Sequence, residues 1–452
     1  MINRVFVLIV FIAGMASGQN TALEEYVETG LENNLALKQQ EFALDRSMEA
    51  LKQARGMFLP SVSIDARYSR AGGGRMIDIP IGDLMNPVYS TLNELLASVG
   101  REPMFPANIS NERIPFLREE EHETKIRLVQ PLFQPAVLYN YKLKSSMKNA
   151  KQAEIEVFKH ELTADIKTAY YNYLKAMQVV GLYGKTKILL EENLRVSKSL
   201  FENNKATEDV VFRAEAELAE LEQKKLAAEK DQKLAAAYFN FLLNRQFSEN
   251  IVTVENTRQN FDLSMDLDQL TDLALENRPE FRQLEFAVNA AQNGIRLSKT
   301  SFVPNVVGVV DYGFQGEKYR FTEEDDFWMA SAVLNWNLFN GGQDKAKYQQ
   351  AVLQKKELET RLHELRQQVK LGVQQAYDEV TVAAKSLVST EKRVTSARKS
   401  FNIVNKKYKQ GMAPHIEYLN SRTTLTNAEI AHIIARFDYQ IKIAELERAA
   451  AL

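Results

Sequence analysis

The sequence predicts an α+β membrane protein in which a long antiparallel coiled-coil α-barrel continues into a transmembrane β-barrel. Three observations lead to this fold class: an internal duplication, four segments that alternate apolar and polar residues, and two helical segments of unusual length. Each protomer supplies four strands, and we expect a 12-stranded barrel from a trimer.

The duplication is visible when residues 23–60 are aligned with residues 267–304. The two segments align without a gap at an offset of 244 and share about ten identities, among them Leu31-Glu32-Asn33 with Leu275-Glu276-Asn277. A second pair of segments follows at an offset near 207, where Ala169-Tyr170 matches Ala376-Tyr377. A repeat at a fixed offset constrains the whole architecture, so it is considered before individual helices and strands are assigned. We therefore expect two structural repeats, residues 19–262 and residues 263–452, each built as helix, two strands, long helix, turn and helix.

The N-terminus predicts an export signal over residues 1–18. Arg4 precedes an apolar run, and Ala16-Ser17-Gly18 forms a small-residue cleavage site, so Gln19 is expected to begin the mature chain. The chain has no cysteine, which excludes disulfides, cysteine-ligated metal, a cysteine nucleophile and an acylated N-terminal cysteine. The net charge is −2, with 57 basic and 59 acidic residues, and this balance indicates no nucleic-acid partner.

Apolar and polar residues alternate in four segments, the pattern of strands that have one apolar face. These segments are residues 61–68, 125–130, 306–314 and 328–338. In the last segment Trp328 and Trp336 fall on one face, roughly 26 Å apart at about 3.3 Å per residue. That separation is close to the height of a lipid-facing band with an aromatic girdle at each edge, so we predict both tryptophans as girdle residues. A soluble sandwich strand with one buried face is the alternative for any single segment.

Four strands cannot close a barrel, and open sheet edges cannot face lipid, because unpaired backbone groups there cost several kcal/mol each. The strands must therefore pair with strands of other copies. Two copies would give eight strands and a barrel filled by its own side chains, whereas three copies leave room for a pore. This geometric argument favours a homotrimer without deciding it.

Apolar residues recur at steps of three and four along residues 343–407 and residues 137–200, the spacing of coiled-coil packing. A helix of about 65 residues is roughly 97 Å long. Each long helix is expected to end at a turn, where Asn204 and Gly411 tolerate the left-handed conformation, and to return over residues 208–247 and 415–451. A cytoskeletal or adaptor coiled coil would account for these helices but not for the strands.

Three features occur together in the sequence: the duplication, the segments Val129-Gln130-Pro131-Leu132-Phe133 and Trp336-Asn337-Leu338-Phe339-Asn340-Gly341-Gly342, and the tip Tyr408–Gly411. In this combination the sequence shows a resemblance to the TolC family of outer-membrane efflux proteins. It implies a homotrimer in the cell outer membrane with a helical tube in the periplasm. It also implies a passive exit duct of a tripartite efflux pump or type I secretion system. A periplasmic adaptor protein and an inner-membrane pump or ABC exporter are the implied partners, and the lipid of the outer membrane surrounds the barrel.

The same resemblance implies a periplasmic gate at Tyr408, Glu417 and Asn420. Tyr408 matches the family's tip tyrosine and Glu417 keeps the carboxylate of a constriction aspartate. Asn420 stands where a second aspartate would be, and Ala413 replaces the family's arginine. A solvated residue at a helix start is the alternative for Glu417. The adaptor-docking tips fall on Asn204, Lys205, Gly411 and Met412.

Nothing in the sequence indicates an enzyme, a cofactor or a metal site, because no nucleophile–base constellation or metal-ligand spacing occurs. We expect His122, which lies among four glutamates, to be part of a solvated loop rim. Residues 69–123, rich in proline and glycine, predict a large extracellular loop of undetermined role.

A periplasmic coiled-coil structural or adaptor protein is the alternative function, and a barrel enzyme would need a polar cluster that the sequence lacks. Neither the cargo nor the class of pump can be read from the sequence.

Overall fold

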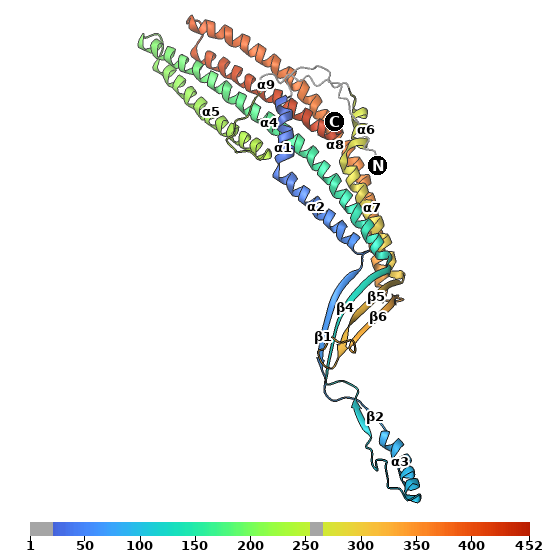
Figure 1. Ribbon diagram of the computed structural model, residues 1–452. Helices are drawn as coiled ribbons and strands as arrows, with labels where there is room; N and C mark the ends of the chain where they lie inside the picture. Colours follow the sequence, from blue (N-terminus) through green and yellow to red (C-terminus); the bar gives the residue numbers. More distant parts are fainter. Residues whose placement is uncertain (1–20, 254–264) are drawn as a thin grey trace, which may run out of the picture. The chain divides into compact units, whose positions relative to one another are not determined.

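A computed structural model describes residues 21–253 and 265–452 (Figure 1). The predicted export segment, residues 1–18, lies outside the described residues. The chain divides into two compact units, each assembled from both halves of the sequence. One unit holds the helical hairpins and comprises the chain up to residue 50 with residues 143–292 and 352–452. The other unit holds the strands and comprises residues 51–142 and 293–351.

The elements recur in the same order in the two halves of the chain. The first half contains α1 (Thr21–Asn33), α2 (Leu35–Gly56), β1 (Ser61–Arg70), β2 (Met76–Ile79), α3 (Ile81–Ser98), β3 (Glu112–Pro115), β4 (Glu120–Phe133), α4 (Pro135–Glu202) and α5 (Glu208–Leu242). The second half contains α6 (Leu267–Asn277), α7 (Pro279–Lys299), the 3₁₀ turn η1 (Thr300–Phe302), β5 (Asn305–Gly316), β6 (Asp326–Asn335), α8 (Gln343–Lys409) and α9 (His415–Ala450). The predicted long helices and their returning partners are therefore confirmed.

The expectation of one helix before the first strand of each half was wrong, because each is interrupted. The side chain of Asn34 accepts hydrogen bonds from the backbone N–H groups of Ala36 and Leu37, so it caps a new helix, α2. In the second half Arg278 is extended because it precedes Pro279, which opens α7. The two breaks lie at equivalent positions, 244 residues apart, although different residues cause them.

The four predicted strands form one antiparallel sheet in the order β1-β4-β5-β6 (Figure 1). The register brings residues of like character to the same face. Ile64 lies opposite Ile126, which lies opposite Tyr312, which lies opposite Trp328. The next apolar row contains Val62, Leu128, Val310 and Ala330. The predicted alternation is thus confirmed in the paired strands, and most large side chains of this apolar face are exposed in the single chain.

Two strand ends differ from the sequence prediction. β4 begins at Glu120, five residues before the predicted start, since it pairs with β1 as far as Arg70. β6 ends at Asn335, so Trp336 and Leu338 lie beyond the strand and not within it. The indole N–H of Trp336 instead donates a hydrogen bond to the carbonyl oxygen of Phe302, at 3.3 Å.

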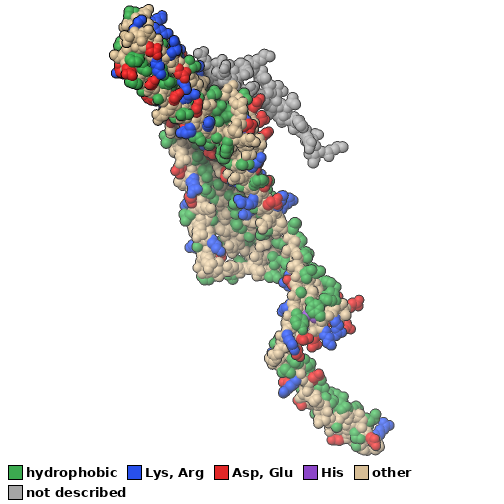
Figure 2. Space-filling view, turned by 90° about the vertical axis from the view of Figure 1, so that its left-hand side faces the viewer, with side chains coloured by type: hydrophobic (Ala, Val, Ile, Leu, Met, Phe, Trp, Pro, Cys, Tyr) green, Lys and Arg blue, Asp and Glu red, His purple; other side chains and the backbone are tan. Residues whose placement is uncertain are grey.

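The prediction of a plain loop over residues 69–123 was also wrong. This segment contains the β2–β3 ribbon and the 18-residue helix α3. Asparagine side chains bind the returning backbone to the helix: Asn86 exchanges two hydrogen bonds with Ile109, at 2.8 and 2.9 Å, and Asn93 exchanges two with Phe105, both at 3.0 Å. Helix α3 includes Pro87, so proline content misled the sequence prediction. Figure 2 shows few charged side chains at the end of the molecule that carries α3.

The helical unit is held by three groups of buried apolar side chains. The largest packs α1 and α2 against α4, α5 and α9, with Tyr26, Tyr170 and Phe239 in edge and tilted contacts at 5.0 to 6.0 Å between ring centroids. The second packs α6 and α7 against α8 and α9 around Val373 and Leu446, both fully buried. The third lies near the α8–α9 turn. Aromatic and branched side chains at coiled-coil spacing thus fix the helix pairs.

In the described part of the chain, every helix is too short or too polar to cross a membrane.

Candidate functional site

The turns that join the helices of each hairpin have the same backbone geometry. In the first turn the N–H groups of Lys205 and Asn204 donate to the carbonyl oxygens of Leu200 and Phe201, each at 2.8 Å. In the second turn the N–H of Met412 donates to the carbonyl oxygen of Lys407 at 2.8 Å, and that of Gly411 donates to Tyr408 at 2.9 Å. Each of these residues lies 207 positions after its counterpart in the first turn. Both patterns are the Schellman motif that ends a helix. Asn204 has φ of 57° and Gly411 of 73°, which confirms the predicted left-handed conformation.

All four predicted docking residues are exposed at these turns. Met412 presents 66% of its surface, and Lys205 extends from the first turn one residue after its left-handed asparagine. Each turn therefore places a small left-handed residue followed by a longer exposed side chain. Two such ends have the same shape but different chemistry, one basic and one apolar.

An aromatic cluster lies directly behind the second turn. The rings of Tyr408 and Tyr418 stack with centroids 4.9 Å apart, and His415 lies 5.6 Å from Tyr408. Phe401 completes the cluster at 5.7 Å from Tyr418. Since α8 supplies Tyr408 and Phe401 while α9 supplies His415 and Tyr418, the cluster holds the two helices together at their turn.

Two polar contacts join this end of the second hairpin to α4 of the first. The side-chain amide of Asn193 lies 3.2 Å from Nε2 of His415, and a guanidinium nitrogen of Arg422 donates to the hydroxyl of Thr186 at 2.8 Å. Both contacts are buried. Arg422 also lies over the ring of Phe401, 5.5 Å from its centroid. A movement that separated α9 from α4 would leave these buried polar groups without partners, which is costly.

Burial shifts the pKa of the titratable groups in this cluster. It raises the pKa of Tyr408, although the neighbouring hydroxyl of Ser197 acts in the opposite direction. It lowers the pKa of His415 below 6.5, and Arg213 of α5 lowers it further while Asp209 opposes this. His415 is therefore neutral near pH 7, and the cluster carries no net charge from its histidine.

Glu417 and Asn420 do not join the aromatic cluster. Both are exposed on α9, whereas Tyr418 between them is buried. They continue as an exposed polar stripe through Thr424 and Asn427, at helical steps of four and three. The sequence reasoning named the first two members of this stripe and missed the other two, which the same spacing could have found. Ala413, where the family pattern has arginine, is buried in the turn.

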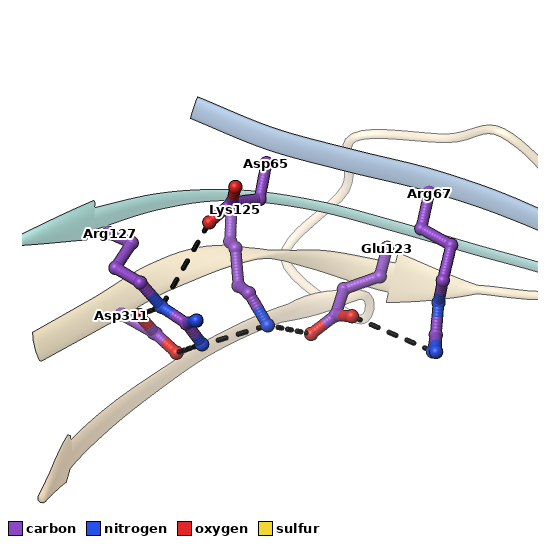
Figure 3. A network of polar contacts seen from close by, with 6 residues as sticks. All are labelled: Asp65, Arg67, Glu123, Lys125, Arg127 and Asp311. Atoms are coloured by element: carbon purple, nitrogen blue, oxygen red, sulfur yellow. Dashed lines mark hydrogen bonds and ion pairs between the residues drawn. The ribbon is translucent and has the colours of Figure 1, made fainter. Parts of the chain in front are cut away.

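On the other face of the sheet from Trp328, charged side chains form one continuous network (Figure 3). Arg127 donates two hydrogen bonds to Asp311, both at 2.8 Å, and lies 3.9 Å from Asp65. Lys125 lies 2.5 Å from Glu123 and 3.9 Å from Asp311, and Glu123 also pairs with Arg67. Three basic and three acidic groups thus alternate across β1, β4 and β5, so the charged face is balanced. The sequence reasoning missed this network because its members are far apart in the chain.

The expectation that His122 belongs to a solvated rim was wrong. His122 is fully buried, because the β5–β6 connection folds over it. Its Nε2 donates to the carbonyl oxygen of Lys318 at 2.7 Å, and its ring stacks on Tyr319 with centroids 4.4 Å apart. Among the described residues, no group of three or more His, Cys, Asp or Glu side chains is placed to hold a metal ion.

Comparisons with known proteins show what the chain is similar to. Residues 270–452 match the model of the outer membrane efflux protein family. This match lies in the second half of the chain. The outer membrane efflux protein BepC of Brucella suis is 21% identical over 272 residues, which is 60% of this chain and 59% of BepC. The alkaline protease secretion protein AprF of Pseudomonas aeruginosa is 20% identical over 331 residues, 72% of this chain and 69% of AprF.

Solved structures share the fold of this chain. A membrane protein from Pseudomonas aeruginosa has a TM-score of 0.78 at 16% identity, with 97% of each chain covered. The outer membrane protein VceC of Vibrio cholerae has a TM-score of 0.74 at 14% identity, with 95% of each chain covered. Part of the chain thus matches a family of outer-membrane efflux proteins, and nearly the whole chain shares the fold of solved outer-membrane proteins.

Proposed function

We propose that this protein is an outer-membrane channel that acts as the passive exit duct of a tripartite efflux pump or a type I secretion system. Three copies close a 12-stranded barrel in the membrane and continue it as a helical tube in the periplasm. The observation that carries the proposal is the four-stranded sheet, which has an exposed apolar face, a charged opposite face and two outer strands, β1 and β6, that pair with only one neighbour each.

The unpaired edges support assembly from several copies. A strand edge exposed to lipid leaves backbone groups without partners at several kcal/mol each. Pairing β6 of one copy with β1 of the next removes both edges. Eight strands would enclose only side chains, whereas twelve enclose a passage wide enough for solutes.

The recurrence of elements supports the internal duplication on which this tube depends. Helix breaks lie 244 residues apart, and the Schellman turns lie 207 residues apart. With residues 19–262 and 263–452 as equivalent repeats, three protomers contribute six hairpins of like length. Such hairpins can surround one axis at even spacing.

The periplasmic end contains the gate and the docking surface. The aromatic cluster around Tyr408 holds the second hairpin closed, and three copies of Glu417 and Asn420 face the passage. Asn204, Lys205, Gly411 and Met412 contact the periplasmic adaptor, which links the duct to an inner-membrane pump or ABC exporter that supplies the energy. The two curated relatives are named for efflux and for protease secretion, so both cargo classes are consistent with the proposal.

The experiment is to purify the protein from outer membranes in detergent, measure its mass and insert it into planar lipid bilayers. We expect a trimer and discrete conductance steps. A monomer that leaves the membrane without detergent and conducts no ions would instead indicate a periplasmic coiled-coil structural or adaptor protein.

A further inference from the structure

An open apolar pocket of about 600 Å³ lies where the end of α2 meets the start of α4. Phe58, Leu59, Leu138 and Tyr141 form its apolar walls, and Lys52 and Arg55 stand at its rim. Phe58 and Tyr141 meet edge to face, 6.1 Å apart, so the pocket has a firm aromatic wall. Its lining is almost wholly apolar, and two of the residues that form it, Lys52 and Arg55, carry a positive charge, which suits a ligand that has an apolar chain and an anionic head.

The pocket belongs to a basic collar, which we define as the helix ends that adjoin the sheet, residues 51–60, 134–142, 293–304 and 340–351. These four segments contain seven basic residues and one acidic residue in a chain whose net charge is −2. The acidic residue, Asp344, is buried and interacts with the side chain of Asn337. The basic residues are Lys52, Arg55, Lys142, Arg296, Lys299, Lys345 and Lys347.

Contacts between neighbouring helices keep these basic residues at one level. The side chain of Asn293 in α7 donates to the backbone carbonyl of Lys142 in α4, at 3.4 Å. Lys299 of α7 lies over the ring of Tyr348 in α8, 5.4 Å from its centroid. Together with the α2–α4 pocket, these contacts set the order α2, α4, α7, α8, which matches the order of the strands that the helices adjoin, β1, β4, β5 and β6. The collar thus follows one whole end of the sheet.

We infer that the basic collar binds anionic phospholipid of the periplasmic leaflet, with phosphate groups on the basic side chains and an acyl chain in the pocket beside Arg55. This inference rests on the proposed function, in which the sheet is the membrane-embedded part. The helices are periplasmic, so their junction with the sheet lies at the level of the periplasmic headgroups. Lys and Arg attract anionic headgroups at such a level, and aromatic side chains such as Tyr141 favour the same depth.

The test compares retention of phosphatidylglycerol and phosphatidylcholine on the detergent-purified protein by native mass spectrometry. We expect phosphatidylglycerol to be retained in preference, and each of Arg55→Gln and Lys299→Gln to weaken its retention about fivefold. Arg46→Gln is the matched control, since Arg46 is exposed on α2 roughly 13 Å along the helix from Arg55, and it should change nothing. Free glycerol phosphate should not displace the lipid, because it lacks the acyl chain.

Equal retention of the two lipids by the native protein, or unchanged retention in both collar variants, would overturn the inference. Displacement by glycerol phosphate would show a phosphate site without an acyl-chain site, and would also contradict it. Conductance of the same samples in planar bilayers separates the two proposals. A conducting protein without lipid preference contradicts only the collar, whereas a non-conducting protein contradicts the proposed duct whatever lipid it retains.

Discussion

Arg127 of β4 and Asp311 of β5 form a two-point ion pair, with both nitrogen–oxygen distances at 2.8 Å. Asp311 has no exposed surface in the single chain and also lies 3.9 Å from Lys125. One buried carboxylate therefore lies within 4 Å of two cations, which also have Glu123 and Asp65 as neighbours. A planar guanidinium that binds a carboxylate through two hydrogen bonds is also fixed in orientation, so this pair holds both charged groups in defined positions.

We predict that Asp311→Asn makes the duct more selective for anions. The substitution keeps the shape of the side chain but leaves Arg127 and Lys125 without their shared carboxylate in every copy of the proposed trimer. The reversal potential under a salt gradient should move toward the anion equilibrium potential. Asp65→Asn is the control, because Asp65 is half exposed and lies 3.9 Å from Arg127, and its effect should be smaller. An equal shift in both variants would contradict a special role for Asp311.

Tyr408→Ala should open the periplasmic end. The substitution removes the ring that stacks on Tyr418 and contacts His415. We estimate a loss of about 2 kcal/mol, roughly half the cost of truncating a fully buried aromatic side chain, since Tyr408 is half-buried. That loss shifts the equilibrium constant between the closed and open states about thirtyfold toward the open state. Resting conductance in planar bilayers measures it.

Tyr408→Phe distinguishes packing from hydrogen bonding at the same position. The Tyr408 hydroxyl lies beside Ser197 without a hydrogen bond of normal geometry. The phenylalanine variant should therefore conduct like the native protein. If it opens as far as the alanine variant, the hydroxyl and not the ring holds the gate.

Acidification should loosen the same end through His415. Burial holds its pKa below 6.5 in the folded tip, so the loosened tip binds the proton more readily than the closed one. The closed state is fully stable above pH 6.5 and loses stability as the pH falls below that value. The groups around the ring are Tyr408 and Tyr418 in the cluster, Asn193 of α4, and Arg213 and Asp209 of α5. Among these groups only Asp209 carries a negative charge that favours the protonated form of His415, and its effect is smaller than that of burial.

Conductance measured from pH 7.5 to pH 5 checks this dependence. We expect an increase in the native protein and a flat profile for His415→Gln, which removes the titrating group. His363→Gln serves as the control because His363 is exposed on α8. If conductance still rises as the pH falls in the His415→Gln variant, a titrating group other than His415 causes the pH dependence.

Glu417→Ala should reduce the preference of the passage for cations. In the proposed trimer three exposed Glu417 carboxylates surround one axis and form a ring that attracts cations, and the substitution removes it. Asn420→Asp, one turn further along the same exposed stripe, should increase the preference by adding a second ring. Block by a divalent cation, measured on single channels, should weaken in the first variant and strengthen in the second. Unchanged block in both would remove this stripe from the gate.

Local patterns in the sequence were sufficient for the four strands of the main sheet and for the two helical hairpins. Alternation predicted four strands, and three-four spacing predicted the helical hairpins, because both signals arise within a single element. Asn204 and Gly411 were predicted as left-handed for the same reason, since the helix end imposes that conformation locally. The helix break at Asn34 was within reach of the sequence too, as its side chain caps its own next turn.

Contacts between distant segments could not be predicted in this way. His122 lies among glutamates in the sequence, yet it is buried because residues near position 319 fold over it. The pairing of Arg127 with Asp311 likewise depends on the register between β4 and β5, which are separated by almost two hundred residues. The sequence by itself determined the four strands of the main sheet, the two long helical hairpins and their order along the chain, but not the break in each first helix nor the elements β2, α3 and β3. Only the tertiary structure decided which charges neutralise one another and which histidine is buried, because burial and ion pairing depend on neighbours that folding brings together.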